Sequence, residues 1–270
     1  MIPYGRQEIT EEDIQAVVNV LRSDYLTQGP CVEQFEQLLA QKVGAEHAIA
    51  VSNGTAALHL ACLALDIREK DIVWTSPISF VASINCALYL KASIDFVDID
   101  PLTRNLSIGA LEEKLKKAKI TNQLPKLLIV VHFSGAPCEM ESIDKLSKQY
   151  GFKVIEDACH ALGSTYQGKS IGQCCFSELC IYSFHPVKNI TTGEGGAIVT
   201  NDYKLSAKLK RLRSHGITRN SIEMGHPIPG DWYYEMIDLG YNYRITDIQA
   251  ALGISQLKKL DHFIQRRTAL

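Results

Sequence analysis

A single lysine stands in the middle of a polar, glycine-rich segment, YSFHPVKNITTGEGGAIVTN, at residues 182–201. The apolar runs 179–182 and 197–200 predict two buried strands joined by a tight polar loop that carries Lys188 and begins near Ser183. A lysine amine held between strands suits covalent chemistry with a carbonyl, and pyridoxal phosphate (PLP) is the commonest carbonyl cofactor that uses one. The alternative is a surface lysine on a glycine-rich turn, and this segment alone does not decide between them.

A second segment has the composition of a phosphate site. The apolar run 48–51 predicts a strand, and the sequence SNGTAAL at 52–58 then predicts a turn of small residues that opens an alanine-rich helix. The first amide groups of such a helix, with Gly54 and the Thr55 hydroxyl beside them, can bind a phosphate. Many strand-to-helix turns use Gly and Thr without binding anything, so this signal needs support from other residues.

Three further side chains follow predicted strands and complete the set that PLP requires. Asp157 can keep the ring nitrogen of a pyridine cofactor protonated, Phe80 can stack on the ring, and His160 can hydrogen-bond the ring hydroxyl. Taken singly, they read equally well as a helix cap, a core aromatic and an interior histidine. Together with the lysine and the phosphate segment, they favour a cofactor site, because ligands collect where strands of an open α/β sheet end.

The elements that must position these residues alternate along the chain. A capping box at Thr10–Asp13 opens a helix with Ile14, Val17, Val18 and Leu21 on its apolar face, and a second helix carries Val32, Phe35, Leu39 and Val43. Further predicted strands lie at 72–75, 94–97, 127–132 and 153–155, and further helices near 79–90, 110–118 and 139–150. Such alternation predicts an α/β fold with a mostly parallel, buried sheet. Residues 220–238 read as a long ordered loop.

Composition excludes several classes of protein. With 46% hydrophobic residues among 270 the chain can bury a sizeable core, and a net charge of -2 gives no electrostatic case for nucleic acid or an anionic membrane. The polar N-terminal segment contains no signal peptide, which predicts a cytoplasmic protein. No apolar run is long enough to span a bilayer. The eight cysteines form no CxxC pair and are expected to be buried free thiols, and no metal site is expected.

With these motifs in this order, the sequence resembles the DegT/DnrJ/EryC1/StrS family of PLP-dependent sugar aminotransferases, which have the aspartate-aminotransferase fold (fold type I). The resemblance lies in five motifs that span most of the chain: SNGTAAL at 52–58, SPISFVAS at 76–83, EDACHALGSTY at 156–166, SFHPVKNITTGEGG at 183–196 and GYNYRITDIQAALG at 240–253.

The resemblance implies a role for each candidate. Lys188 corresponds to the lysine that forms the Schiff base with PLP, and Asp157 to the partner of the ring nitrogen. Phe80 would stack on the ring, and His160 stands where many relatives have glutamine.

The phosphate ligands implied by the resemblance come from two chains. Gly54, Thr55 and Ser183 would hold the phosphate, with Asn242 contributed by the neighbouring subunit. The family therefore implies a homodimer with shared active sites. Without the resemblance, Asn242 would be read as a turn residue before a helix.

Within the family, the similarity is strongest to the branch that serves pseudaminic acid biosynthesis. This branch transfers an amino group from glutamate to a UDP-linked 4-keto-6-deoxy-N-acetyl-hexosamine, and SDYLTQG at 23–29, HFSGAPCEME at 132–141 and ITTGEGG at 190–196 resemble it. The substrate contacts that this implies are Tyr4, Tyr25, Leu26, Thr27, Gly54, Ser183 and Asn242. Three alternatives stay open: another nucleotide-linked ketosugar, a dehydratase of the same family, and a catalytically inactive member acting in regulation or interaction. A dehydratase would carry histidine in place of Lys188.

The family also implies a division of the chain. Residues 1–244 are expected to form the PLP-binding large domain with an N-terminal helical segment. Residues 245–270 are expected to begin the connection to a small C-terminal domain that is largely missing. The helix expected at 245–264 would then leave part of an apolar face bare, formed by Ile245, Ile248, Leu252, Leu257 and Leu260. Residues 1–270 alone are therefore expected to bind PLP weakly, to aggregate, and to transaminate poorly or not at all.

Overall fold

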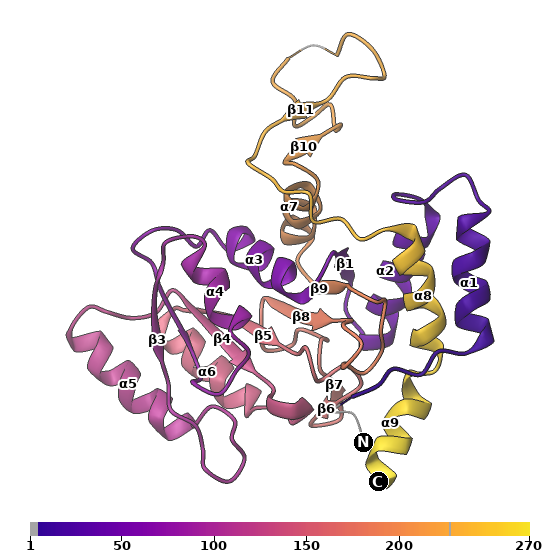
Figure 1. Cartoon of the computed structure of the whole chain (residues 1–270). Coiled ribbons are helices and arrows are strands. Elements are labelled where there is room, and N and C mark those ends of the chain that lie inside the picture. Colours follow the sequence, from indigo (N-terminus) through magenta and orange to yellow (C-terminus); the bar gives the residue numbers. More distant parts are fainter. Residues whose placement is uncertain (1–4, 227) are drawn as a thin grey trace.

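The computed structural model describes residues 5–226 and 228–270. At its centre is a seven-stranded sheet with the strand order β1-β9-β8-β5-β4-β2-β3 (Figure 1). The strands are β1 (His47–Val51), β2 (Ile72–Thr75), β3 (Ser93–Phe96), β4 (Leu127–Val131), β5 (Lys153–Asp157), β8 (Leu179–Ser183) and β9 (Gly196–Thr200). Within this sheet β9 runs antiparallel to both of its neighbours, and the other pairs are parallel. The mostly parallel sheet is therefore confirmed.

Both faces of the sheet are covered by helices, which explains the continuous apolar sequence of its strands. One face packs against α3 (Gly54–Ala64), α4 (Ala82–Leu88) and α7 (Tyr203–Arg213), through residues such as Ile129 and Ile181. On the other face, Leu128 and Val130 pack against α5 (Ile108–Ile120) and α6 (Met140–Tyr150). Because neighbouring residues of a strand point to opposite faces, β4 contributes to both cores.

Residues 184–195 link the antiparallel strands β8 and β9 and carry Lys188. The two strands meet with Ser183 opposite Gly196. A Cβ atom added at Gly196 would lie 2.5 Å from the backbone carbon of Asn53, so a larger residue would push β9 away from the turn that opens α3. Glycine at this position thus brings the lysine segment against the predicted phosphate segment.

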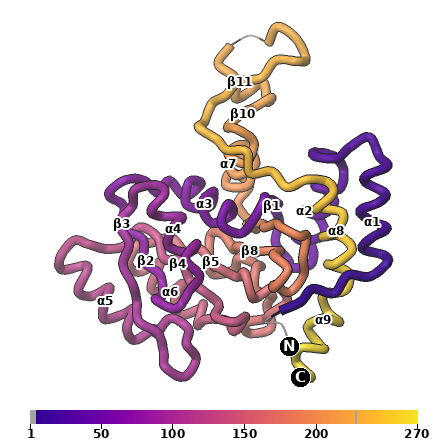
Figure 2. The backbone as a smooth tube through the Cα atoms, viewed as in Figure 1, coloured from indigo at the N-terminus to yellow at the C-terminus, as the bar shows by residue number. Residues whose placement is uncertain are grey.

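Four further helices pack together at one end of the molecule, where one of them also covers the face of the sheet formed by β1, β8 and β9 (Figure 2). They are α1 (Glu11–Leu21), α2 (Pro30–Val43), α8 (Asp247–Lys258) and α9 (Leu260–Ala269), and α8 packs against both α1 and α2. The prediction of one helix over 245–264 is wrong, because α8 ends at Lys258 and α9 begins at Leu260, with Lys259 capping both helices.

The expectation that part of an apolar face is left bare is also wrong for most of the residues named. Ile245, Leu257 and Leu260 are buried, because they pack into a core that includes residues of α2. Ile248 and Leu252 are half-buried. These helices therefore already find partners within residues 5–226 and 228–270.

The buried face of α1 differs from the predicted one. Ile14 and Leu21 are 48% and 56% exposed, whereas Asp13 is fully buried. The Asp13 carboxylate accepts hydrogen bonds from Lys259 and from the side-chain amide of Gln256. A buried carboxylate is stable when such donors are present. The ion pair of Asp13 therefore helps to decide which side of α1 faces the interior, and hydrophobic periodicity does not predict it.

The segment predicted as a long ordered loop, with the residues on either side of it, forms an arm (residues 217–226 and 228–239) that projects from the body (Figures 1 and 2). At its base, β10 (Ile217–Thr218) pairs with β11 (Glu235–Met236). Five of its large apolar side chains are more than half exposed: Ile222, Trp232, Tyr234, Met236 and Leu239.

The described residues contain no helix that is both long and apolar enough to cross a membrane. Within that same part of the chain, no three His, Cys, Asp or Glu side chains gather closely enough to hold a metal ion. All eight cysteines are free thiols, as expected, but Cys175 is exposed and Cys31, Cys159 and Cys174 are half-buried.

Candidate active site

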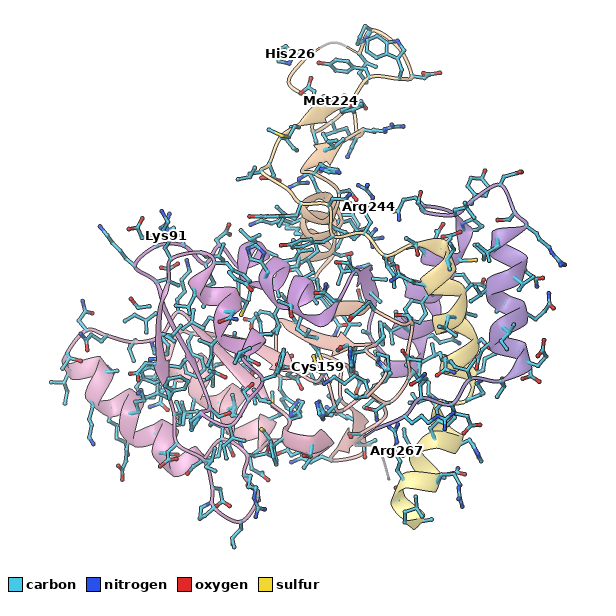
Figure 3. The ribbon with its side chains drawn as sticks, viewed as in Figure 1. Lys91, Cys159, Met224, His226, Arg244 and Arg267 are labelled. Atoms are coloured by element: carbon cyan, nitrogen blue, oxygen red, sulfur yellow. The ribbon has the colours of Figure 1, made fainter. Side chains whose placement is uncertain are left out.

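A cavity of about 1040 Å³ opens where β1, β2, β4, β5 and β8 end. Seven candidates from the sequence line it: Gly54, Thr55, Phe80, Asp157, His160, Ser183 and Lys188. Figure 3 shows Cys159, which also lines it, in the middle of the molecule, whereas Met224 and His226 lie far out on the arm. The fold thus brings these seven candidates, which come from four separate segments of the sequence, to one place.

Lys188 lies against His160. Its Nζ is 2.6 Å from Nε2 of the imidazole. Burial, and next the positive charge of Lys188, lower the pKa of His160, so this ring is neutral at neutral pH. A neutral imidazole accepts a hydrogen bond from an ammonium group, which directs the amine of Lys188 into the cavity beside the ring.

Asp157 is the last residue of β5, and hydrogen bonds fix both of its carboxylate oxygens. The Ser83 hydroxyl donates to Oδ2 at 2.6 Å, and the backbone N–H of Cys159 donates to Oδ1 at 3.2 Å. A second hydroxyl, that of Ser79, lies 2.6 Å from Ser83 Oγ. Neither serine was predicted as a site residue from the sequence, although both lie inside the SPISFVAS motif.

The turn before α3 leaves amide groups free for an anion. The Asn53 side chain caps the helix by accepting from the N–H of Ala56 at 2.8 Å, and the amides of Gly54 and Thr55 precede that position. A Cβ atom at Gly54 would come within 3.0 Å of the Ser183 Cβ and 3.4 Å of the Cys159 sulfur. Glycine therefore leaves space where the helix N-terminus meets the Ser183 side chain.

These residues fit PLP. A helix N-terminus with hydroxyl groups beside it suits the phosphate, a fixed carboxylate suits the ring nitrogen, and a lysine amine suits the aldehyde. Phe80 is 71% exposed on the cavity wall, so its ring is available for stacking and is not a core aromatic. Within the part of the chain that the structure describes, Lys188 is the only lysine that lines this cavity.

The cavity continues past the phosphate segment into an aromatic cluster that was not predicted from the sequence. His59 lies between Tyr89 and Tyr241, with ring centroids 5.2 Å and 4.9 Å away, and its Nδ1 is 3.2 Å from the Tyr243 hydroxyl. Burial lowers the pKa of His59, and its buried Nε2 has no hydrogen-bond partner among the described residues. A single histidine in an apolar helix gives no sequence signal for such a position.

A buried histidine shapes another part of the wall. The N–H of Cys138 donates to Nδ1 of His132 at 3.2 Å, so the hydrogen lies on Nε2, which is 2.8 Å from a Glu156 oxygen. This pair fixes the start of the turn that places Phe133 and Ser134 on the cavity lining.

The remaining predicted residues do not line this cavity. Asn242 is exposed and forms an isolated antiparallel β-bridge with Ser214 at the base of the arm. Tyr25, Leu26 and Thr27 lie on the exposed loop before α2, which Asp247 holds by accepting from the N–H groups of Gly29 and Val32 at 3.0 Å. Tyr4 lies outside the described residues.

The model of the DegT/DnrJ/EryC1/StrS aminotransferase family matches residues 7–270. The chain belongs to this family. A curated member, the UDP-4-amino-4,6-dideoxy-N-acetyl-beta-L-altrosamine transaminase of Campylobacter jejuni, is 44% identical over 269 residues, which are 99% of this chain and 67% of that protein. The chain thus spans about two thirds of the length of the curated relatives it matches.

Solved structures agree with this assignment. Helicobacter pylori PseC, an aminotransferase involved in the biosynthesis of pseudoaminic acid, matches with a TM-score of 0.85 and 36% identity, over 96% of this chain and 66% of that one. The PLP form of a sugar aminotransferase from Streptococcus pneumoniae matches with a TM-score of 0.85 and 27% identity, over 99% and 69%. The predicted family and the aspartate-aminotransferase-like α/β fold are confirmed.

Proposed function

We propose that this protein is a PLP-dependent nucleotide-sugar aminotransferase. The observation that carries the proposal is that Lys188 shares the cavity with Asp157 and the N-terminus of α3. The proposed reaction moves an amino group from glutamate to the 4-keto carbon of a UDP-linked 4-keto-6-deoxy-N-acetyl-hexosamine. The assignment of this substrate rests on the similarity of the chain to the altrosamine transaminase and to PseC.

Each residue of the cavity has a task in this reaction. Lys188 would hold PLP covalently, Asp157 would keep a proton on the ring nitrogen, and Phe80 would cover one ring face. The phosphate would rest on Gly54, Thr55 and Ser183. When bound, PLP supplies a ring that accepts electrons from a carbanion.

Proton transfer is assigned to the Lys188 amine. A proton must leave the donor's carbon and later be delivered to the sugar carbon, and a free amine within the cavity can move it. His160 keeps Nζ in position, because its neutral ring accepts a hydrogen bond at 2.6 Å. Ser83 and the Cys159 amide keep the carboxylate of Asp157 in one orientation.

The lysine also separates the proposal from the dehydratase alternative. A dehydratase of this family has histidine where this chain has Lys188. Other nucleotide-linked ketosugars, such as those of lipopolysaccharide O-antigens or antibiotics, remain alternatives for the substrate.

We further propose a homodimer with shared sites. Two features support it: Asn242, the expected phosphate ligand, lies outside its own chain's cavity, and the neighbouring arm exposes large apolar side chains. A second subunit could cover the arm and receive Asn242, and two-fold dimers are the commonest oligomers. The division into a domain at 1–244 and a connection at 245–270 also remains a proposal, as does a cytoplasmic location.

The test is an assay of the purified full-length protein with glutamate and a panel of nucleotide-linked ketosugars. We expect 2-oxoglutarate and an aminosugar with the UDP-linked 4-keto-6-deoxy-N-acetyl-hexosamine, and no product in Lys188→Ala. If the protein turned over only a different ketosugar, the proposed substrate would be wrong. A protein that binds PLP but transaminates none of the panel would favour an inactive family member.

A further inference from the structure

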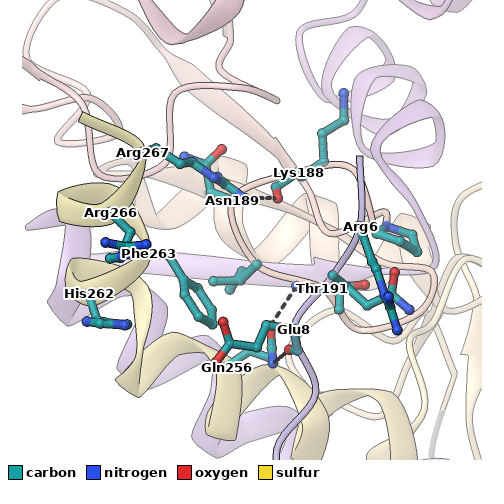
Figure 4. Close-up of a pocket in the computed structure, with 13 residues that line it drawn as sticks. Arg6, Glu8, Lys188, Asn189, Thr191, Gln256, His262, Phe263, Arg266 and Arg267 are labelled. Carbon is teal, nitrogen blue, oxygen red and sulfur yellow. Dashed lines mark hydrogen bonds between the residues drawn. The ribbon is translucent and has the colours of Figure 1, made fainter. Parts of the chain in front are cut away.

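The loop that carries Lys188 has a second side, facing helices α8 and α9 (Figure 4). A small cavity of about 200 Å³ lies there, lined by the loop and by residues that include Gln256, Arg266 and Arg267. In Figure 4 the Lys188 side chain extends away from these helices. Its backbone carbonyl, in contrast, is within reach of α9.

Arg267 contacts that carbonyl directly. Its Nη2 donates a hydrogen bond to the Lys188 oxygen at 3.1 Å. The acceptor belongs to the backbone of the lysine itself, so the contact restrains the Cα atom from which the amine projects. Arg266, the preceding residue, lines the same small cavity, but no hydrogen bond or ion pair of its side chain is found among the described residues.

Gln256 holds the same loop three residues further on. Its Nε2 donates to the Glu8 carbonyl at 2.9 Å and to Asp13 Oδ2 at 2.8 Å. Both partners can only accept, so the amide has one orientation, and its oxygen faces the N–H of Thr191 at 3.4 Å. Gln256 is 1% exposed, which makes this arrangement part of the packed interior.

We propose that Arg267 and Gln256 are positioning residues for Lys188. They act from the side of the loop opposite its amine and touch neither PLP nor substrate. The ends of the loop are fixed by β8 and β9, and these two side chains restrain its middle. The proposal rests on the proposed function in one respect, namely that Lys188 is the residue that PLP modifies. A reacting group that is held less well spends less time in productive geometry.

The first experiment needs no cofactor. Amide hydrogen exchange of residues 187–192 is compared in the PLP-free protein for wild type, Arg267→Gln, Arg267→Lys and the matched control Arg266→Gln. Arg267 is exposed, so these variants should fold. We expect exchange about three- to tenfold faster in Arg267→Gln, wild-type rates in Arg266→Gln and an intermediate rate in Arg267→Lys. Equal rates in Arg267→Gln and Arg266→Gln would refute the proposal.

The second experiment measures the amine. PLP is added to the same proteins, borohydride is added after varied times, and the labelled Lys188 peptide is quantified by mass spectrometry. We expect PLP to attach to Lys188 several-fold more slowly in Arg267→Gln than in Arg266→Gln. Attachment should also be slower in Gln256→Met than in wild type. Faster exchange with unchanged attachment would make the contact structural only and overturn the positioning role. If wild type itself takes no label, the proposed function fails, whereas the exchange experiment still decides whether these contacts hold the loop.

Discussion

Asp157 is the residue whose charge the proposed chemistry uses most directly. Asp157→Asn keeps the shape of the side chain but cannot balance a protonated ring nitrogen. We expect kcat to fall by at least about a hundredfold, because a preorganised electrostatic contact contributes several kcal/mol to the transition state. PLP affinity, measured by titration of the cofactor's absorbance, should change little, since the phosphate contacts remain. Near-normal turnover would assign this task to another carboxylate.

Ser83 gives a finer test at the same scale. Its buried hydroxyl donates to Asp157 at 2.6 Å. A hydrogen bond to a charged group contributes about 1.5–3 kcal/mol, so Ser83→Ala should lower kcat about tenfold or more. Ser83→Thr keeps a hydroxyl and serves as the matched control, which we expect to recover most of the loss. Equal kcat and equal KM in wild type and Ser83→Ala would show that Asp157 needs no such support.

His59 links the site to pH. Burial lowers its pKa, so the folded state resists protonating it. In the unfolded chain, this histidine takes up a proton at about pH 6.5. As the pH falls through that value, the unfolded state therefore binds a proton that the folded state does not bind. The free energy of unfolding should therefore decrease on acidification, and less so in His59→Asn. Urea unfolding at about pH 7.5 and about pH 5 checks this, and identical decreases in both proteins would contradict it.

At the scale of elements, the main prediction is that Asn242, at the base of the arm, completes the active site of a second subunit. Lys188→Ala and Asn242→Ala are each expected to be inactive, because each removes one side of a shared site. Mixing the two should form dimers in which one site has both groups intact, restoring up to about a quarter of wild-type activity. The unmixed variants are the controls. No recovery in demonstrated mixed dimers would mean that each site is built from one chain.

The elements also show what sequence reasoning can and cannot reach. Strand β2 and the apolar face of α2 follow from periodicity, since their burial depends on the residues of the segment itself. The break between α8 and α9 and the inward position of Asp13 were missed. Asp13 is buried because Lys259 and Gln256, far along the chain, supply its partners, and local sequence does not contain that information.

At the scale of the whole molecule, the predicted catalytic and cofactor residues other than Asn242 gather in one cavity. They were predictable because strand ends meet at one edge of a parallel sheet and because the motifs resemble a family. Ser83, His59 and Arg267 were not predicted. Each of them contacts a residue far away in the sequence, and only the folded chain brings the two segments together.

The central claim is that Lys188 carries PLP, and borohydride reduction followed by peptide mapping tests it most directly. The account predicts that wild type incubated with PLP and then reduced carries one pyridoxyl label, on Lys188. Lys188→Ala should carry none and should lack the visible absorption band of the lysine-bound cofactor. A label on Lys169 or Lys204 instead, or a full label in Lys188→Ala, would contradict the account.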